Sequence, residues 1–152
     1  MSAATPASVV VESDGGARGN PGPAGIGALV FDETVSPRVV LATVSEYIGE
    51  TTNNVAEYEA AIAGLRAAQD LGASEVELRA DSKLVIEQLA GRWRVRQAHL
   101  RPLHARARRL IDALGSVALR HVPREQNVDA DALANAAMDA GARDAATAPR
   151  RS

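Results

Sequence analysis

Four acidic residues stand where a predicted strand or helix begins or ends. Asp14 ends an apolar, β-branched run, and Asp81 ends a second run in which apolar residues alternate. Glu57 and Asp131 each fall in the first turn of a predicted helix. Carboxylates that are brought together raise one another's pKa and cost stability unless a cation neutralises them. Their shared position therefore indicates a site for cations.

The composition limits which cations these are. The chain has no cysteine, and its three histidines show no His-x-x-His spacing. Oxygen-only ligands favour Mg²⁺ or Mn²⁺ over zinc. Two such ions about 3.5–4 Å apart could activate a water and stabilise the leaving oxygen of an in-line displacement. We therefore predict two divalent cations, Mg²⁺ or Mn²⁺, at this site.

Each acid also has a purely structural explanation. Asp14 could be a turn residue. Glu57 could complete a capping box with Asn54, three residues earlier. Asp81 could cap the helix that follows it, and Asp131 could favour the positive end of its own helix. For each acid alone these explanations are at least as good as a ligand role, but together they do not explain why the acids converge.

Hydrophobic periodicity predicts the elements that position these acids. Strands are expected over 8–14, 26–31, 39–47, 75–80 and 117–122, and helices over 55–71, 83–90, 100–114 and 128–140. The short spacing of the first three strands predicts an antiparallel meander, and strands and helices alternate afterwards. The sequence thus predicts an α/β fold with a mixed five-stranded sheet, three antiparallel strands followed by parallel additions, flanked by helices.

Length and composition fit one globular domain. The chain has 152 residues, of which 46% are hydrophobic and 24% charged. We predict a frayed N-terminus over 1–7, a single domain over 8–140, and a disordered tail or truncated linker over 141–152, where no apolar period is visible. No run reaches the length of a membrane span and residues 1–8 lack signal-peptide regions, so we expect a cytoplasmic monomer without a membrane partner.

Charge is distributed unevenly although the net charge is only −2. Seven arginines and no acid lie between Gln88 and Ile111. Such clusters attract phosphates, although on a helix they are usually a solvated face. Acids in one region and arginines in another suggest metal ions that act on a polyanion.

Four motifs in these regions resemble the type 1 ribonucleases H, which cut the RNA strand of RNA–DNA hybrids. They occur in family order over roughly residues 8–140: Ser13-Asp14-Gly15-Gly16 with Gly19-Asn20-Pro21-Gly22, Thr52-Asn53-Asn54-Val55-Ala56-Glu57, Ala80-Asp81-Ser82-Lys83, and Asn127-Val128-Asp129-Ala130-Asp131-Ala132-Leu133-Ala134. The resemblance implies a ribonuclease H-like fold. It also implies an endonuclease that uses two metal ions and leaves 5′-phosphate and 3′-hydroxyl ends.

The resemblance assigns roles residue by residue. It implies that Asp14, Glu57, Asp81 and Asp131 are the catalytic metal ligands. Asp129 competes with Asp131, but the Asp-x-Leu-Ala context belongs to Asp131. Contacts to the hybrid are implied for the backbone of Gly15, Gly16 and Ala17, and for the side chains of Asn20, Thr52, Asn53, Asn54 and Ser82.

The chain departs from many family members in two places. The loop before the last predicted helix is short, and Arg124 is the expected substitute for the histidine of longer loops. His121 competes with Arg124, although a structural role on the strand is expected for it. No lysine-rich handle is present, so the segment with Trp93, Arg94 and Arg96 is the expected contact to the DNA strand. Trp93 could stack on a sugar or base, or pack on the sheet edge.

Some actinobacterial family members continue into a phosphatase-like domain, and the linker-like tail permits a fused C-terminal domain here. Two rival functions also remain open. One is a DNA-processing nuclease such as a junction resolvase or integrase, against which the Thr-Asn-Asn-Val-Ala-Glu motif argues. The other is a non-catalytic hybrid-binding module, against which the four acids argue. A nucleotide-binding loop is disfavoured because residues 15–22 lack the Gly-Lys-Ser/Thr ending.

Overall fold

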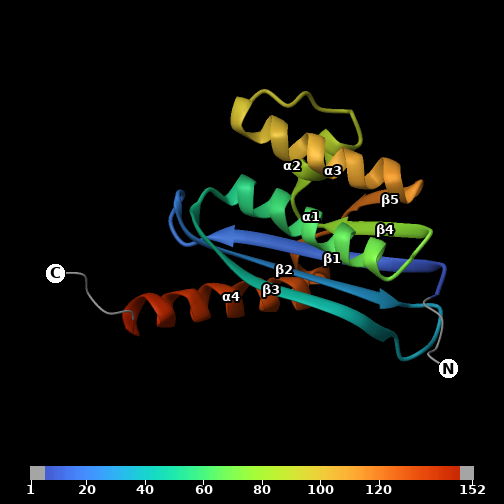
Figure 1. The fold of residues 1–152 in the computed structure, drawn as a ribbon, viewed down its shortest axis with the longest axis horizontal. Helices are drawn as coiled ribbons and strands as arrows, with labels where there is room; N and C mark the ends of the chain where they lie inside the picture. Colours follow the sequence, from blue (N-terminus) through green and yellow to red (C-terminus); the bar gives the residue numbers. More distant parts are fainter. Residues whose placement is uncertain (1–5, 148–152) are drawn as a thin grey trace.

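A mixed five-stranded sheet forms the centre of the molecule in the computed structural model, which describes residues 6–147 (Figure 1). Its strands lie in the order β3-β2-β1-β4-β5. The β1–β2 and β2–β3 pairs are antiparallel, and the β1–β4 and β4–β5 pairs are parallel. The strand bounds are Ser8–Ala17 for β1, Gly22–Asp32 for β2, Val39–Thr51 for β3, Glu75–Ala80 for β4 and Ser116–His121 for β5. The predicted fold class is therefore confirmed.

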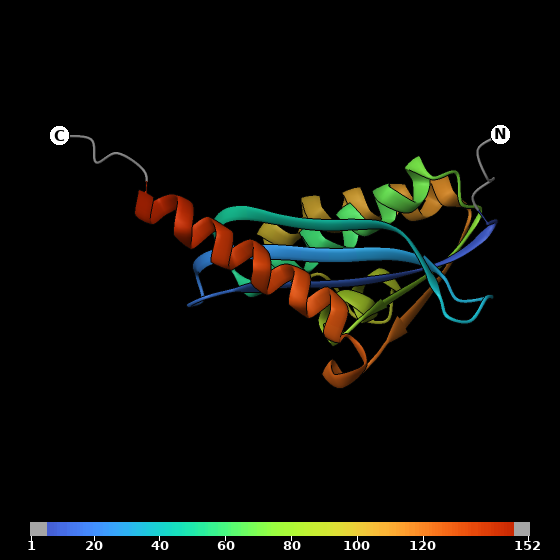
Figure 2. The same cartoon turned by 90° about the horizontal axis from the view of Figure 1, so that it is seen from below.

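Helices cover both faces of the sheet (Figure 2). One face carries α1, α2 and α3, and the other carries α4 (Figures 1 and 2). The helix bounds are Asn53–Asp70 for α1, Lys83–Leu89 for α2, Arg101–Leu114 for α3 and Val128–Thr147 for α4, with short 3₁₀ turns at Ala98–Leu100 and Arg124–Gln126. None of the helices within residues 6–147 is long and apolar enough to cross a membrane.

The two faces differ in how they are packed. The larger apolar core joins β1 and β4 to α1, α2 and α3, and it includes Tyr58, Ile62 and Leu65. The core under α4 is much smaller, with Val10, Leu29, Phe31 and Ala130 as its buried members. Apolar burial is the main source of folding free energy. Because α4 buries less apolar surface, its attachment to the sheet depends more on close backbone packing, hydrogen bonds and ion pairs.

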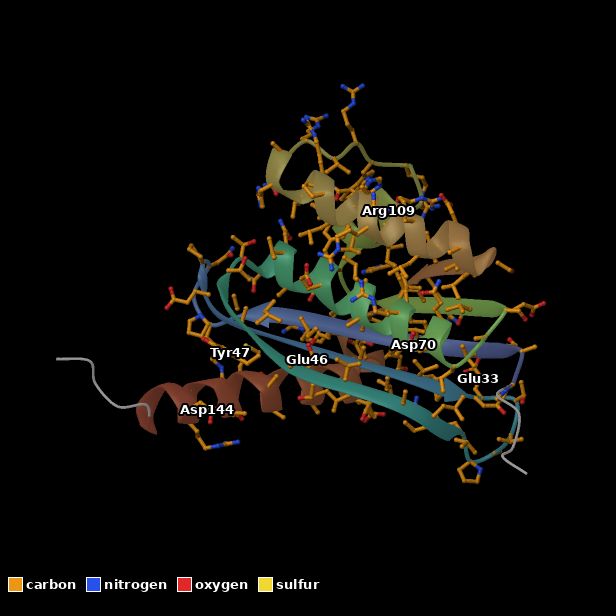
Figure 3. All side chains as sticks on the ribbon, viewed as in Figure 1. Glu33, Glu46, Tyr47, Asp70, Arg109 and Asp144 are labelled. Atoms are coloured by element: carbon orange, nitrogen blue, oxygen red, sulfur yellow. The ribbon has the colours of Figure 1, made fainter. Side chains whose placement is uncertain are left out.

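Three glycines let α4 approach the sheet closely. A methyl group added at Gly27 would lie 2.3 Å from the carbonyl oxygen of Ala130, and one added at Gly25 would lie 2.7 Å from that of Ala134. On the helix itself, a methyl group at Gly141 would lie 2.2 Å from the Tyr47 ring. Tyr47 points from β3 toward α4 (Figure 3).

Several boundaries differ from the sequence prediction. Strand β1 continues through Gly15 and Gly16 to Ala17, because these residues still pair with β2. Helix α4 continues to Thr147, so the predicted disordered tail was wrong for residues 141–147. Alanine-rich sequence favours helix without any apolar period. Residues 148–152 of that tail, and 1–5 of the predicted frayed N-terminus, lie outside the described residues. Ala7 is anchored, since its carbonyl oxygen accepts hydrogen bonds from Ser74 and Glu75.

The close packing of α4 predicts that even an alanine at position 27 strongly destabilises the fold. Gly27→Ala should lower the free energy of unfolding by about 2–3 kcal/mol, because the methyl group meets helix backbone that cannot move aside alone. Urea denaturation measures this. Gly16→Ala is the matched control, since its methyl group would meet only the Met138 side chain at 3.7 Å. Equal stability of the two variants would contradict the close packing.

Candidate active site

Sheet register brings Asp14 and Asp81 together. Strands β1 and β4 are adjacent and parallel, and Ser13 lies opposite Ala80. Asp14 follows Ser13 and Asp81 follows Ala80, so both carboxyl groups lie at the same end of the sheet. Asp81 does not cap α2, because the Ser82 hydroxyl accepts the hydrogen bond from the Val85 amide at 3.3 Å. The structural explanation for Asp81 was therefore wrong.

Glu57 reaches this point from the first turns of α1. Its Oε1 accepts a hydrogen bond from the Gly15 amide at 2.9 Å. A methyl group at Gly15 would lie 2.2 Å from the Ala56 carbonyl oxygen, so only glycine lets the helix backbone come this close. The helix is capped by Thr52, whose hydroxyl accepts from the Val55 amide. The capping box considered for Glu57 is thus replaced by a bond to β1.

The three acids form one cluster. Carboxylate oxygens of Asp14, Glu57 and Asp81 all lie within 4.8 Å of one another. Asp131 approaches from α4 and is close enough to interact with the Asp14 carboxyl group. All four acids line a single cleft of about 680 Å³. Sequence reasoning therefore predicted the convergence of these four acids correctly.

Burial and mutual repulsion perturb the protonation of the cluster. Burial, followed by the neighbouring Glu57 charge, raises the pKa of Asp14 far above its usual range. Burial also raises the pKa of Glu57, although the bonds from Asp14 and Gly15 oppose the shift. The raised pKa values indicate that Asp14 and Glu57 share a proton when no cation is bound. A bound cation would supply the positive charge in place of that proton.

Asn127 holds Asp131 beside β1, and sequence reasoning missed it as a site residue. Its Nδ2 donates to the Ser13 carbonyl oxygen at 2.9 Å, one residue before Asp14. Its own carbonyl oxygen accepts from the Asp131 amide at 3.1 Å. The side chain is completely buried. Its place before an acidic first helical turn suggests a helix cap, but its Oδ1 has no hydrogen-bond partner among the described residues, so the sequence held no signal for its bond to β1.

Asp129, the competitor of Asp131, points elsewhere. It pairs with Arg38, whose guanidinium also lies 3.5 Å from the buried Glu12 and stacks over the Phe31 ring. This arrangement connects the first turn of α4 to β1. Burial raises the pKa of Glu12, with Arg38 opposing the shift. Asp131, in contrast, lines the cleft with Asp14, Glu57 and Asp81.

Both candidates for the missing loop histidine lie at the cleft. Arg124 is 85% exposed, and its Nε stands 4.0 Å from the Asp81 carboxylate. A ring nitrogen of His121 lies 3.3 Å from the Asp81 carbonyl oxygen, and the side chain is exposed at the end of β5. Both residues line the cleft with the acids, so the geometry is compatible with either one in place of the loop histidine.

Hydrogen bonds connect several of the predicted hybrid-contacting residues at the edge of the cleft. Asn53 accepts a hydrogen bond from the Ala17 amide at 2.8 Å, and Asn20 accepts one from the Asn53 amide at 3.1 Å. These bonds join the turn to the start of α1. The residues of this predicted set that line the cleft are Gly15, Gly16, Ala17, Asn53 and Ser82. Thr52 and Ser82 also serve as helix caps.

Trp93, Arg94 and Arg96 belong to a second groove of about 520 Å³. Trp93 is 44% exposed, and the Lys83 ammonium lies 5.8 Å from its ring centre. Leu84 and Gln88 of α2 line the same groove. Trp93 therefore lies beside α2 with its ring partly exposed.

The raised carboxyl pKa values predict how stability depends on pH. A carboxyl whose pKa is higher in the folded state binds its proton more tightly there, so stability falls as pH rises above the unfolded value. Without divalent cations, the melting temperature should fall between about pH 5 and about pH 8. Asp14→Asn should raise it at the upper pH by about 3–6 °C.

Asp112→Asn is the matched control for this stability measurement. Asp112 lies exposed on α3 and pairs with Arg108 outside the cleft. This variant should keep the wild-type pH dependence. Equal melting temperatures for Asp14→Asn and Asp112→Asn at both pH values would contradict the claim that the charged cluster destabilises the fold.

Comparisons with known proteins place these motifs in a family. Residues 12–137 match the family described as Reverse transcriptase-like. The chain is 51% identical over 138 residues to the Bifunctional protein Rv2228c of Mycobacterium tuberculosis, and 45% identical over 126 residues to Ribonuclease HI of Halobacterium salinarum. These matches cover 91% and 83% of the chain. The chain spans 37% of the length of the first relative and 62% of the second.

Solved structures agree with the sequence matches. The N-terminal RNase H domain of Rv2228c superposes with a TM-score of 0.83 at 50% identity, covering 87% of this chain and 99% of that one. LC11-RNase H1, solved in complex with an RNA/DNA hybrid, superposes with a TM-score of 0.81 at 42% identity, covering 88% and 98% of the two chains.

Proposed function

Because this chain belongs to the type 1 ribonuclease H family, we propose that it is an endonuclease that hydrolyses the RNA strand of RNA–DNA hybrids. The observation that carries the proposal is the convergence of Asp14, Glu57, Asp81 and Asp131 in one open cleft. The relative solved with an RNA/DNA hybrid supports the substrate class.

The acidic cluster is the proposed site of two divalent cations, Mg²⁺ or Mn²⁺. Its donor atoms are all carboxylate oxygens, which suit hard cations. Burial raises the pKa of Asp14 and of Glu57, and a bound cation would offset this cost by stabilising their charged forms. Asp14 would ligate both ions, while Asp81 and Asp131 would each complete the ligand set of one. When bound, such cations make a water more acidic and offset charge on the leaving oxygen.

In the proposed reaction the protein holds the scissile phosphate over Asp14. A water oxygen bonds to phosphorus and gives up a proton to bulk water as the bond from phosphorus to the 3′-oxygen breaks. The 3′-oxygen takes a proton from bulk water, which leaves 5′-phosphate and 3′-hydroxyl ends. Glu57, fixed by the Gly15 amide, would also orient the ribose 2′-hydroxyl. Arg124, exposed beside Asp81, would take the part of the loop histidine of other family members, which helps proton transfer or product release.

The edge of the cleft and the second groove are proposed to grip the two strands. A hybrid presents a shallow minor groove with 2′-hydroxyls, which small amides and bare backbone can read. Gly15, Gly16 and Ala17 would meet RNA sugars. The side chains proposed to hold the hybrid around them are Asn20, Thr52, Asn53, Asn54 and Ser82. The groove with Trp93, Arg94 and Arg96 would hold the DNA strand by stacking and phosphate contacts.

Other expectations from the sequence stay predictions of the proposal. They are a monomeric chain in the cytoplasm and a fused C-terminal domain in the full-length protein. The match to a portion of a bifunctional mycobacterial protein supports the fused domain.

A cleavage assay tests the proposed activity. The protein should cut the RNA strand of a labelled RNA–DNA hybrid with Mg²⁺ or Mn²⁺, and it should leave duplex DNA and duplex RNA intact. Asp14→Asn and Asp131→Asn should each reduce the rate by more than about 100-fold, because they remove ligands of the charge-stabilising cations, while hybrid binding persists.

Asp129→Asn is the matched control for Asp131→Asn, since its carboxylate pairs with Arg38 outside the cleft. It should retain most of the cleavage rate. Cleavage of duplex DNA would favour the DNA-processing alternative, and hybrid binding without cleavage would favour the non-catalytic module. Either result would overturn the proposed activity.

A further inference from the structure

Arg18 is a cationic residue of the cleft that the proposed function leaves without a role. It follows β1 directly, and its amide donates to the Pro23 carbonyl oxygen at 2.8 Å, which fixes the backbone of the β1–β2 turn. Its side chain lines the cleft that holds the four acids, together with Asn135 and Met138 of α4. Arg18 therefore belongs to the α4 side of the cleft.

The partner of Arg18 leaves it available to a ligand. Its guanidinium lies 2.5 Å from the Asp139 carboxylate, and the two side chains are 46% and 52% exposed. Exposed ion pairs of this kind add little to stability. Arg38 and Arg79 each bind two carboxylates and are only 34% and 17% exposed. Unlike them, Arg18 can exchange the Asp139 carboxylate for another anion at small cost.

The cleft offers cations on two sides of the acidic cluster. Arg124 stands beside Asp81 on the side of β4 and β5, and Arg18 stands at the β1–β2 turn beyond Asp14. A nucleic-acid strand that places one phosphate over the acids must place its neighbouring phosphates along the cleft on either side. A guanidinium is well suited to such a phosphate, because it can donate two parallel hydrogen bonds.

We propose that Arg18 binds an RNA-strand phosphate next to the one that is cleaved, and that it leaves Asp139 to do so. This inference rests on the proposed function. It makes Arg18 a substrate-binding residue and Asp139 its competitor, so the two members of one ion pair have opposite effects. A merely structural ion pair would give the same effect whichever partner is removed.

Hybrid binding across a range of salt concentrations tests the proposal. All variants are made in the Asp14→Asn chain, which should bind the hybrid without cutting it, and affinity is read by fluorescence anisotropy. Arg18→Gln should weaken binding by about 3–10-fold and reduce the slope of log affinity against log salt by about one, as expected for one lost phosphate contact. Asp139→Asn should bind at least as tightly as its parent.

Arg108→Gln is the control for general loss of positive charge, since Arg108 forms an exposed pair with Asp112 on α3. It should leave the salt slope unchanged. Equal weakening by Arg18→Gln and Asp139→Asn would overturn the proposal, as would an unchanged slope in Arg18→Gln. If the Asp14→Asn parent fails to bind the hybrid, the proposed function itself fails, so the two failures are distinguishable.

A neutral methylphosphonate identifies the strand. Placed in the RNA strand beside the cleavage site, it should weaken binding by the parent and abolish the difference between parent and Arg18→Gln. The same substitution in the DNA strand should leave that difference intact. If only the DNA-strand substitution abolishes the difference, the assignment to an RNA phosphate is wrong.

Discussion

Mutual repulsion among four carboxyl groups is the constraint on which the rest of this structure depends. Four acids meet in one cleft: Asp14 of β1, Glu57 of α1, Asp81 directly after β4, and Asp131 of α4. Burial and like charge raise the pKa of Asp14, so the arrangement opposes folding at neutral pH unless cations are bound. Several contacts around the cleft hold these groups together against that repulsion.

The devices that hold them are mostly backbone contacts. Adjacent parallel strands bring two aspartates to one sheet end, and the bare α-carbon of Gly15 lets α1 deliver Glu57. Gly27 lets α4 lie against β2, and Asn127 joins the start of that helix to β1. Because the apolar core under α4 is small, the close packing at Gly27 and the Asn127 hydrogen bond position Asp131.

Local sequence patterns were sufficient to predict the sheet, the helices and the four acids. They depend on periodicity and on residue types at element ends, which are properties of neighbouring residues. Asn127 and Arg38 could not be assigned in this way, because each acts on a strand far away in the sequence. The same holds for Gly15 and Gly27, whose importance lies in which helix backbone faces them. The end of α4 was misjudged because alanine-rich helices carry no apolar period.

The most direct test of the central claim is the titration of the carboxyl groups themselves. Carbon-13 NMR of the Asp14 and Glu57 side chains should be followed against pH, with and without Mg²⁺. The structure predicts that both carboxyl groups titrate above their usual range in metal-free protein, and that Mg²⁺ lowers both values. Ordinary pKa values without metal, or raised values that Mg²⁺ does not change, would contradict the claim that this cluster exists to bind cations.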